Sequence, residues 1–484
     1  AINKIEVEGN LTNKGDIQTL DNISIKENAL NKGNILTNGF FTSKDLKNEK
    51  VLSAKDSITV NKLENSGKIL TGKDLVVKDN LINSSKIEAI GNIKVSENVL
   101  NAGDILTNGS FSAKDTKTTK SLVAKEGISV NNLESKGIVA TNKELNINGR
   151  LENSGNIQAT DKITVLENVL NSGEILTNSS FTSKDVKTTN KLVSKEDITV
   201  GKLENLGTVI TNKKLNVAGE LKNSGDIQTL DNISIKENAL NKGNILTNGF
   251  FTSKDLKNEK ILSVKNDITI NKLENNGKIV TGKNLDISKS LENSGRIEAT
   301  GNILISENAN NTGDILTNGS FLAKDTKTTK SLIAKEGITV SNLESSGIVA
   351  TNKELNINGS LENNGNIQAI DKIDILGNVV NTGEILTNGK FTAKDINSKK
   401  LVALKGISVN NLKNDETIAT NENLDIAGNF ENKGKVSTNK SLNIAGELKN
   451  SGDIQTLDNI LIKENTLNKG NILTNGFFTS KDLK

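Results

Sequence analysis

The chain is built from repeats. Residues Leu20 to Lys50 recur without a change as Leu230 to Lys260. A shorter period also aligns the chain with itself, and each comparable block opens at a leucine. These leucines are Leu11, Leu81, Leu151, Leu221, Leu291 and Leu361. Because a repeat of this kind decides the architecture of the whole chain, it constrains the fold more than any other feature.

Each block divides into four units with apolar residues at the same offsets, and in the first block the units begin at Leu11, Ala29, Leu46 and Leu63. The first unit has Ile17 six positions after its start, and Ile23 and Ile25 twelve and fourteen positions after it. Side chains at even spacing share one face of a strand, whereas a helix needs a spacing of three or four. Asn and Gly, which recur at the unit length, disfavour a helix and suit corners between short strands. The units therefore predict an all-β fold.

The predicted architecture is a single-stranded parallel β-helix, a solenoid in which each unit forms one turn. A single turn cannot bury its own apolar residues, so each turn must stack on the next. Counting from Leu11 to Leu483 gives roughly 27 turns of 17 or 18 residues. We expect residues 1–484 to be one continuous solenoid fragment. Its parts are a partial turn at 1–10, six four-turn blocks at 11–429, an extra turn at 430–447 and the start of a further block at 448–484.

An Asn-x-Gly signature lies between the first two apolar positions of many units, as at Asn13 and Gly15. We expect these asparagines to point inward and to bond to the Asn above and below, because a buried amide needs partners. We interpret the glycines as corner residues with permissive backbones rather than as ligand cradles. The predicted structural ladder is Asn13, Asn31, Asn65, Asn83, Asn153, Asn223, Asn293, Asn363, Asn432 and Asn450.

Phenylalanine returns once in every block, in the position twelve after the start of a turn. This position is in phase with the inward apolar residues, so the rings are predicted to lie in the core and not to form a platform for sugars. The predicted core aromatic series is Phe41, Phe111, Phe181, Phe251, Phe321, Phe391 and Phe478.

The composition excludes several kinds of site. The chain has no Cys and no His, so disulfides, a cysteine nucleophile and histidine-based catalytic or metal sites cannot form. We expect no cofactor and no metal. The formal net charge of +3 is too small to recruit nucleic acid. No apolar run is long enough to span a membrane, and no signal peptide is visible, so we interpret the chain as an internal fragment.

The Asn-x-Gly strings resemble the repeats of filamentous haemagglutinin-like exoproteins. The resemblance is carried by the segments that start at Leu11, Leu151 and Leu361, and it extends over nearly the whole chain. This family includes two-partner-secreted adhesins and contact-dependent growth inhibition exoproteins. The resemblance implies a right-handed β-helix, export through an outer-membrane two-partner secretion transporter, and display at the bacterial surface or secretion. The units are somewhat shorter than is usual for the family.

An enzyme is the main alternative, because parallel β-helices also house carbohydrate-active enzymes. Such enzymes need clustered carboxylates and long loops on one face, and the units leave no room for long loops. The Lys-Asp pairs at 44–45, 114–115, 184–185 and 254–255 are either a binding stripe or solvated corners with local ion pairing. We favour the corner interpretation. Asn-x-Ser strings such as Asn108 to Ser110 are weak glycosylation signals in an Asn-rich chain.

The function expected from these observations is a rigid, extended stalk of a bacterial cell-surface or secreted adhesin, and not an enzyme. The stalk would project a binding module or contribute to binding a host or bacterial cell-surface receptor. A carbohydrate-active enzyme and the stalk of a contact-dependent toxin-delivery exoprotein are the alternatives. The sequence does not separate a passive spacer from a stalk that itself binds a receptor.

Overall fold

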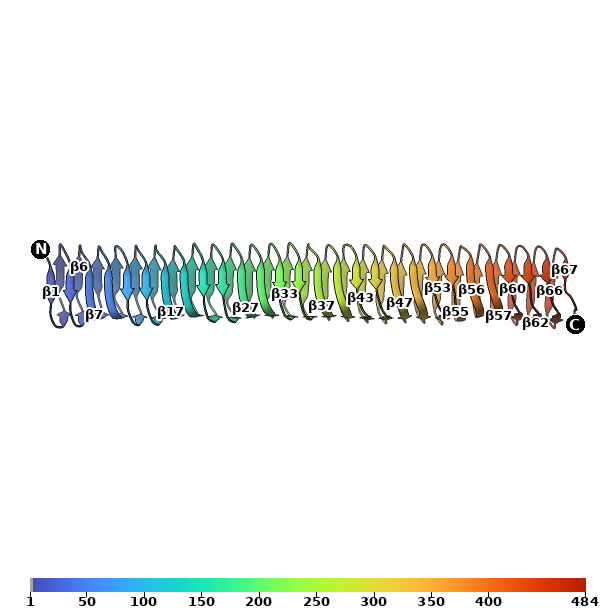
Figure 1. Ribbon diagram of the computed structural model, residues 1–484, viewed down its shortest axis with the longest axis horizontal. Coiled ribbons are helices and arrows are strands. Elements are labelled where there is room, and N and C mark those ends of the chain that lie inside the picture. The colour runs from blue at the N-terminus through green and yellow to red at the C-terminus, as the bar shows by residue number, and fades with distance from the viewer. Residues whose placement is uncertain (1–2) are drawn as a thin grey trace. The chain divides into compact units, whose positions relative to one another are not determined.

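The computed structural model describes residues 3–484, which form β-strands joined by short corners, with no helix. The strands run parallel and stack about 18 residues apart in a β-solenoid of about 26 turns, which confirms the predicted fold class. The chain divides into two compact units, one of residues up to 238 together with 243–247, and one of 239–242 together with 248–484. Within each unit, equivalent strands of successive turns lie side by side (Figure 1).

Ten strands make one block, and they recur at the same positions from block to block. After β1 (Ile5–Val7), the first block has β2 (Leu11–Asn13), β3 (Asp16–Thr19), β4 (Ile23–Ile25), β5 (Ala29–Asn31), β6 (Asn34–Thr37), β7 (Phe41–Asn48), β8 (Val51–Ala54), β9 (Ile58–Asn65), β10 (Lys68–Thr71) and β11 (Leu75–Val77). Each later block repeats these bounds at its own equivalent positions, from β12 (Leu81–Asn83) through β51 (Leu355–Ile357).

The strands after β51 depart from this pattern at three places, where segments that are separate in earlier blocks join into one strand. The three joined strands are β55 (Val379–Thr387), β56 (Phe391–Ala403) and β57 (Ile407–Thr420). The other strands after β51 are β52 (Leu361–Asn363), β53 (Asn366–Ala369), β54 (Ile373–Ile375), β58 (Leu424–Ile426), β59 (Phe430–Asn432), β60 (Lys435–Thr438), β61 (Leu442–Ile444), β62 (Leu448–Asn450), β63 (Asp453–Thr456), β64 (Ile460–Ile462), β65 (Thr466–Asn468), β66 (Asn471–Thr474) and β67 (Phe478–Thr479).

Each turn contributes one strand to each of three parallel sheets, which we name the first-, second- and third-strand faces. β2, β3 and β4 are one such set, and they pair in register with β5, β6 and β7 of the next turn. The register places Leu11 beside Ala29, Asn13 beside Asn31 and Ile17 beside Ile35. Since side chains alternate along a strand, every inward position forms a column along the stack.

The core consists of these columns. Leu, Ile, Val and Phe fill the first, second and third apolar positions, and nearly all of them are buried, as at Ile157. Branched side chains fit the pleated surface of stacked strands well. The columns also include buried Asn, Thr and Ser, so polar groups of the core must find partners inside the stack.

Most of the Asn-x-Gly glycines are required by close stacking of the backbone, although a Cβ atom on Gly15 would meet nothing within 4 Å. A Cβ atom on Gly33 would lie 1.9 Å from the carbonyl oxygen of Gly15, and one on Gly103 would lie 1.8 Å from that of Ser85. The prediction that these glycines serve a permissive backbone is therefore wrong, because none of them has a positive φ. In the described residues only Gly127, Gly337 and Gly406 have one.

Turn length varies at the corners, and one turn is shorter than predicted. In the shorter turns of a block the corner after the third strand loses a residue, so that the third strand runs into the next first strand, as in β7. A further residue is lost within β56, between Ser398 and Lys400, so that Asn381 pairs with Ser398 but Glu384 pairs with Lys400. The predicted turn length fails here, and a β-bulge absorbs the missing residue.

Thr116 offers a test of the core packing. It lies in an apolar column between Val99 and Leu133, is 3% exposed, and its hydroxyl has no hydrogen-bond partner. Thr116→Val should slow hydrogen exchange in the surrounding strands, because it removes an unsatisfied buried hydroxyl and keeps the shape of the side chain. The free energy of local opening should rise by about 1 to 3 kcal/mol. Val186 already holds the equivalent position in the next block.

Thr118→Val is the matched control, because the Thr118 hydroxyl accepts a hydrogen bond from Asn101 at 3.0 Å. This change should accelerate exchange. Equal effects of the two substitutions would contradict the assignment of Thr116 as an unsatisfied group.

Candidate functional site

A column of asparagine amides runs through the first-strand side of the core. Asn31 donates from Nδ2 to Oδ1 of Asn48, and Asn48 donates in the same way to Asn65, each at 2.8 Å. The same amides donate to backbone carbonyls at the corner, as from Asn65 to Lys86 at 3.2 Å. The bonds satisfy amides that burial would otherwise leave unpaired.

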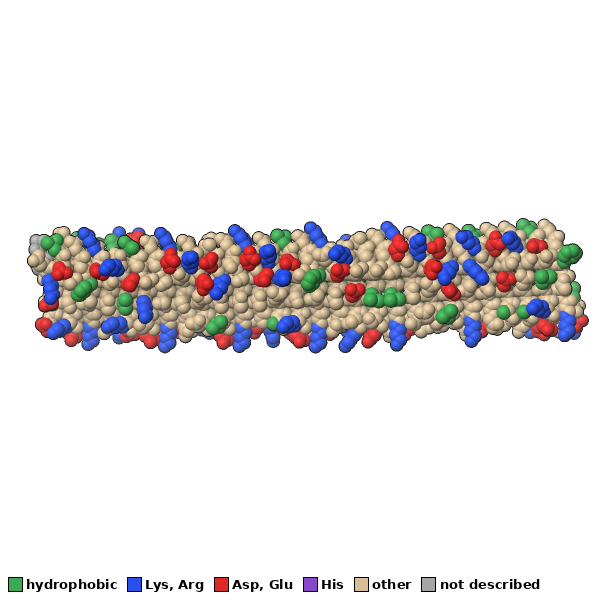
Figure 2. Space-filling model, turned by 45° about the horizontal axis from the view of Figure 1, so that its top comes forward, with side chains coloured by type: hydrophobic (Ala, Val, Ile, Leu, Met, Phe, Trp, Pro, Cys, Tyr) green, Lys and Arg blue, Asp and Glu red, His purple; other side chains and the backbone are tan. Residues whose placement is uncertain are grey.

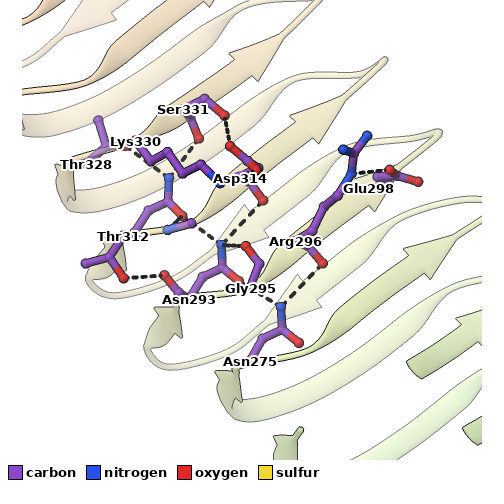
Figure 3. A network of polar contacts seen from close by, with 12 residues as sticks. Asn275, Asn293, Gly295, Arg296, Glu298, Thr312, Asp314, Thr328, Lys330 and Ser331 are labelled. Atoms are coloured by element: carbon purple, nitrogen blue, oxygen red, sulfur yellow. Dashed lines mark hydrogen bonds and ion pairs between the residues drawn. The ribbon is translucent and has the colours of Figure 1, made fainter. Parts of the chain in front are cut away.

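Figure 3 shows this arrangement at Asn275 and Asn293. The Asn275 amide donates to Asn293 at 2.8 Å and also reaches the carbonyl oxygen of Arg296. The Asn293 amide likewise reaches the carbonyl oxygen of Asp314. Each amide thus ties its own turn to two parts of the next one.

All ten asparagines of the predicted ladder are buried and lie in this column. Direct bonds join Asn13 to Asn31, Asn65 to Asn83 and Asn432 to Asn450. The others bond to asparagines that the predicted ladder left out, although all of these except Asn48 are followed by a glycine two residues later. These include Asn48, Asn101, Asn171, Asn205, Asn311, Asn381 and Asn468. Their offset of two from the start of each turn would have found them.

The column is interrupted where Ser or Thr replaces Asn. Asn101 donates to Thr118, but Ser135 in the next turn donates to the carbonyl of Gly137 and not along the column. Asn153 therefore donates to Asn171 at 2.8 Å and accepts no bond from the Ser135 beneath it. The expectation that Asn153 is paired both above and below is corrected to a bond on one side.

The six phenylalanines from Phe41 to Phe391 in the predicted series are fully buried. Phe41 lies between Ile23 of the previous turn and Ile58 of the next. Phe478, the seventh, is only half-buried, because it pairs with Ile460 and no later described strand covers it. Phe430 is also buried, but in the first position of its turn.

The lysines of the Lys-Asp corners pair with glutamates of the preceding turn. The nitrogen–oxygen distances are 3.5 Å from Lys44 to Glu27 and 3.1 Å from Lys114 to Glu97. Asp115 accepts a hydrogen bond from Asn132 at 2.7 Å. Exposed pairs of this kind contribute at most about 1 kcal/mol each. The contacts support solvated corners with local ion pairing, the interpretation favoured from the sequence.

A groove runs along the first-strand face. Two hollows of about 500 and about 400 Å³ lie between Asn80 and Lys222 and share Arg150 and Glu152, so they are continuous. A hollow of about 520 Å³ occupies the same face at residues 378–449. Sequence reasoning missed this groove, because it arises from the shape of the stacked corners and not from a motif.

Apolar side chains and ion pairs alternate along the floor of the groove. Lys117 contacts Glu134 at 2.9 Å and Lys187 contacts Glu204 at 2.8 Å, while Leu170 is exposed between them. No aromatic ring lines the hollows between Asn80 and Lys222, so they lack the usual stacking platform for a sugar. The groove is suited to an extended chain with both charged and apolar groups.

The carboxylates with lowered pKa values are held by hydrogen bonds on the surface. Lys330 and Ser331, labelled with Asp314 in Figure 3, each donate a hydrogen bond to Asp314 at 2.7 Å and lower its pKa. Lys120 at 2.8 Å and Ser121 at 2.7 Å lower the pKa of Asp104 in the same way. Asp286 is the exception, because burial first and the nearby Asp267 second raise its pKa. These shifts report the local surroundings of each carboxylate.

The described residues contain no group of three or more His, Cys, Asp or Glu that could hold a metal ion. In residues 3–484 no helix is present that is long and apolar enough to cross a membrane.

Comparison with known proteins gives no further assignment. No protein-family model, no curated protein and no solved structure matches the chain.

Asn153 provides a test of the amide column. Asn153→Ala should lower the local stability of β22 (Leu151–Asn153) and β25 (Val169–Asn171) by about 1 to 3 kcal/mol, because Asn171 and the N–H of Gly155 lose their partner. Hydrogen exchange of the intact chain measures this, since local opening can be resolved strand by strand.

Asn156→Ala is the control, because Asn156 is exposed on the neighbouring strand, and it should change exchange very little. Slowing or no change for Asn153→Ala would mean that the column does not stabilise the stack.

Asp286 gives a pH-dependent test. Its folded pKa is raised, so the folded state binds the proton more tightly and loses stability as the pH rises through that pKa. Asp286→Asn should therefore slow local exchange near neutral pH relative to wild type at the same pH. The difference should vanish in acid, below both pKa values.

Asp314→Asn should behave oppositely, since the pKa of Asp314 is lowered. Its carboxylate stabilises the fold above the unfolded pKa, and this stability is lost as the pH falls through the folded pKa. If both substitutions shifted stability in the same direction at neutral pH, the assigned environments would be wrong.

Proposed function

We propose that the chain is the extended stalk of a bacterial surface or secreted exoprotein of the filamentous haemagglutinin-like kind. The observation that carries this proposal is the constancy of the blocks. From β2 to β51 the same ten strands recur with unchanged bounds, and no loop is inserted between them. Added chain length therefore produces more turns and does not elaborate a site, which suits a spacer.

The bonding within each unit suits a load-bearing element. The hydrogen bonds of all three sheets connect one turn to the next, and the asparagine column adds a further bond, as between Asn48 and Asn65. A pull along the stack therefore loads several hydrogen bonds per turn together. Opening one turn requires breaking them as a set.

The same organisation supports export through an outer-membrane two-partner secretion transporter, which we include in the proposal. Each turn contacts mainly its neighbours, so the chain is able to fold turn by turn as it emerges from a pore. Folding outside the cell would place the stalk at the cell surface or in the medium. A receptor on a host or bacterial cell, if the stalk itself binds one, would be sought at the groove between Asn80 and Lys222.

Deleting one block tests the spacer function. Removal of residues 151–220 joins Arg150 to Leu221, the equivalent of Leu151, so the register of every column is preserved. The shortened chain should keep its β-sheet circular dichroism. Its length should fall by four strand spacings, about 19 Å, as measured by small-angle X-ray scattering or electron microscopy.

In a surface-display fusion, the same deletion should bring a binding module at the end of the chain closer to the cell. Removal of residues 151–210 is the matched control, because it breaks the register and should disrupt the stack locally. A register-preserving deletion that left the molecular length unchanged would refute the stalk proposal.

A further inference from the structure

The second-strand face carries an aliphatic column on its outward side. Its strands have four residues, of which the first and third point outward, such as Glu174 and Leu176 on β26 (Glu174–Thr177). The first outward position is mostly charged or polar. The third is often Leu, Val or Ile; most of these side chains are half-buried by their neighbours, and others, such as Leu36 and Leu246, are exposed. This face is uninterrupted by long loops, so its outward columns are accessible to a partner.

Two apolar groups on this face lie within the first unit, a pair and a run of three. Leu106 on β16 (Asp104–Thr107) is in register with Val123 on β18 (Ser121–Ala124). Leu176 on β26 is in register with Val193 on β28 (Lys191–Ser194), and Val193 is also in register with Ile210 on β30 (Thr208–Thr211). Strands β20 (Ile138–Thr141) and β23 (Asn156–Ala159) separate the two pairs.

Opposite charges accompany the two pairs, and in both the acidic group comes first along the stack. Beside the first pair, Asp104 precedes Lys120, and the two are 2.8 Å apart. Beside the second pair, Glu174 precedes Lys191, at 3.6 Å. When one copy of this face is reversed about an axis along the strands, the acidic Asp104 of the first pair is placed against the basic Lys191 of the second, and Glu174 is placed against Ser121, which directly follows Lys120. Charges of both signs lie close together over the surface, as Figure 2 shows for one side of the molecule.

We propose that the second-strand face binds a second copy of this chain in the reversed direction. A two-fold axis along the strands, midway between β20 and β23, places Leu106 against Val193 of the second copy and Val123 against Leu176. The same operation places Asp104 against Lys191 of the second copy. All of these contacts form at one register, and the symmetry generates each of them twice.

The second unit carries the same arrangement independently. Leu316 is in register with Ile333, and Leu386 with Val402. An axis midway between β50 (Ile348–Thr351) and β53 places Leu316 against Val402 of the second copy and Ile333 against Leu386.

The charges of the second unit follow the same rule. Asp314 bonds to Lys330, and Lys400 bonds to Glu384. The axis of the second unit sets Asp314 against Lys400 of the second copy. The arrangement is thus present in both units.

A second copy fits this face better than an unrelated partner. The apolar contacts and the charge contacts form together only if the partner carries the same groups at the same spacing along its stack. The net charge of +3 on 484 residues opposes association only weakly. The strip from β16 to β28 is about 24 Å long and about 13 Å wide, or roughly 300 Å² per copy. This is well below the area of a typical stable interface, so the association is weak and depends on concentration.

The inference does not depend on the stalk proposal, since it concerns only the surface of the folded chain. If the chain is also a stalk, neighbouring stalks would bundle side by side.

Sedimentation of the intact chain over micromolar to near-millimolar concentrations tests the proposal. The wild type should show reversible self-association. Variant A, Lys191→Glu with Lys400→Glu, should associate at least about tenfold more weakly, because carboxylates would then face Asp104 and Asp314 of the second copy. Variant B, Asp104→Lys with Asp314→Lys, should be weakened in the same way.

An equimolar mixture of A and B should restore association, because the new carboxylates at positions 191 and 400 of A then face the new lysines at positions 104 and 314 of B. The control is Leu166→Lys with Leu376→Lys, which alters exposed leucines at a different corner and should change nothing. Circular dichroism verifies that every variant is folded. A wild type that stays monomeric throughout would overturn the proposal, as would an A and B mixture that remains as weak as its components.

Discussion

Within each unit of this protein the strands bond to their equivalents one turn away, and the rest of the structure depends on that in-register stacking. Because of this register, each inward position forms a column. A side chain in a column must therefore pack against the side chains at the same position in the turns above and below it. The register also brings corner backbones within contact, which is why Gly33 has no room for a Cβ atom. A shift of one residue would turn apolar columns outward. Changes in turn length are consequently confined to corners, as at the bulge after Asn381.

The features that sequence revealed are those that repeat with the turn. The apolar offsets predicted the strands and the inward position of Ile157, and the Asn offset predicted buried amides such as Asn65. Features that depend on contact between particular turns were not visible. The unsatisfied hydroxyl of Thr116, the interruption at Ser135 and the close approach at Gly33 follow from what lies above and below each residue.

The surface follows a different logic from the core. Many of its charges pair across adjacent turns, as Lys187 does with Glu204. The groove on the first-strand face arises where these paired charges alternate with Leu170 and similar residues. It was hidden from sequence reasoning because its walls come from residues of successive turns, and only the cross-section of a turn shows that they enclose a hollow.

The asparagine column has a direction. Each amide donates from Nδ2 to the oxygen of the following turn, from Asn13 to Asn31 and onward, so the side-chain dipoles within a run all point the same way. Aligned hydrogen bonds polarise one another, and the run acquires unlike ends, an acceptor at its start and a donor at its finish. Thr118 is able to close such a run because its hydroxyl oxygen accepts the last donor. Each run is in this respect an electrical counterpart of an α-helix, assembled from side chains and not from the peptide backbone.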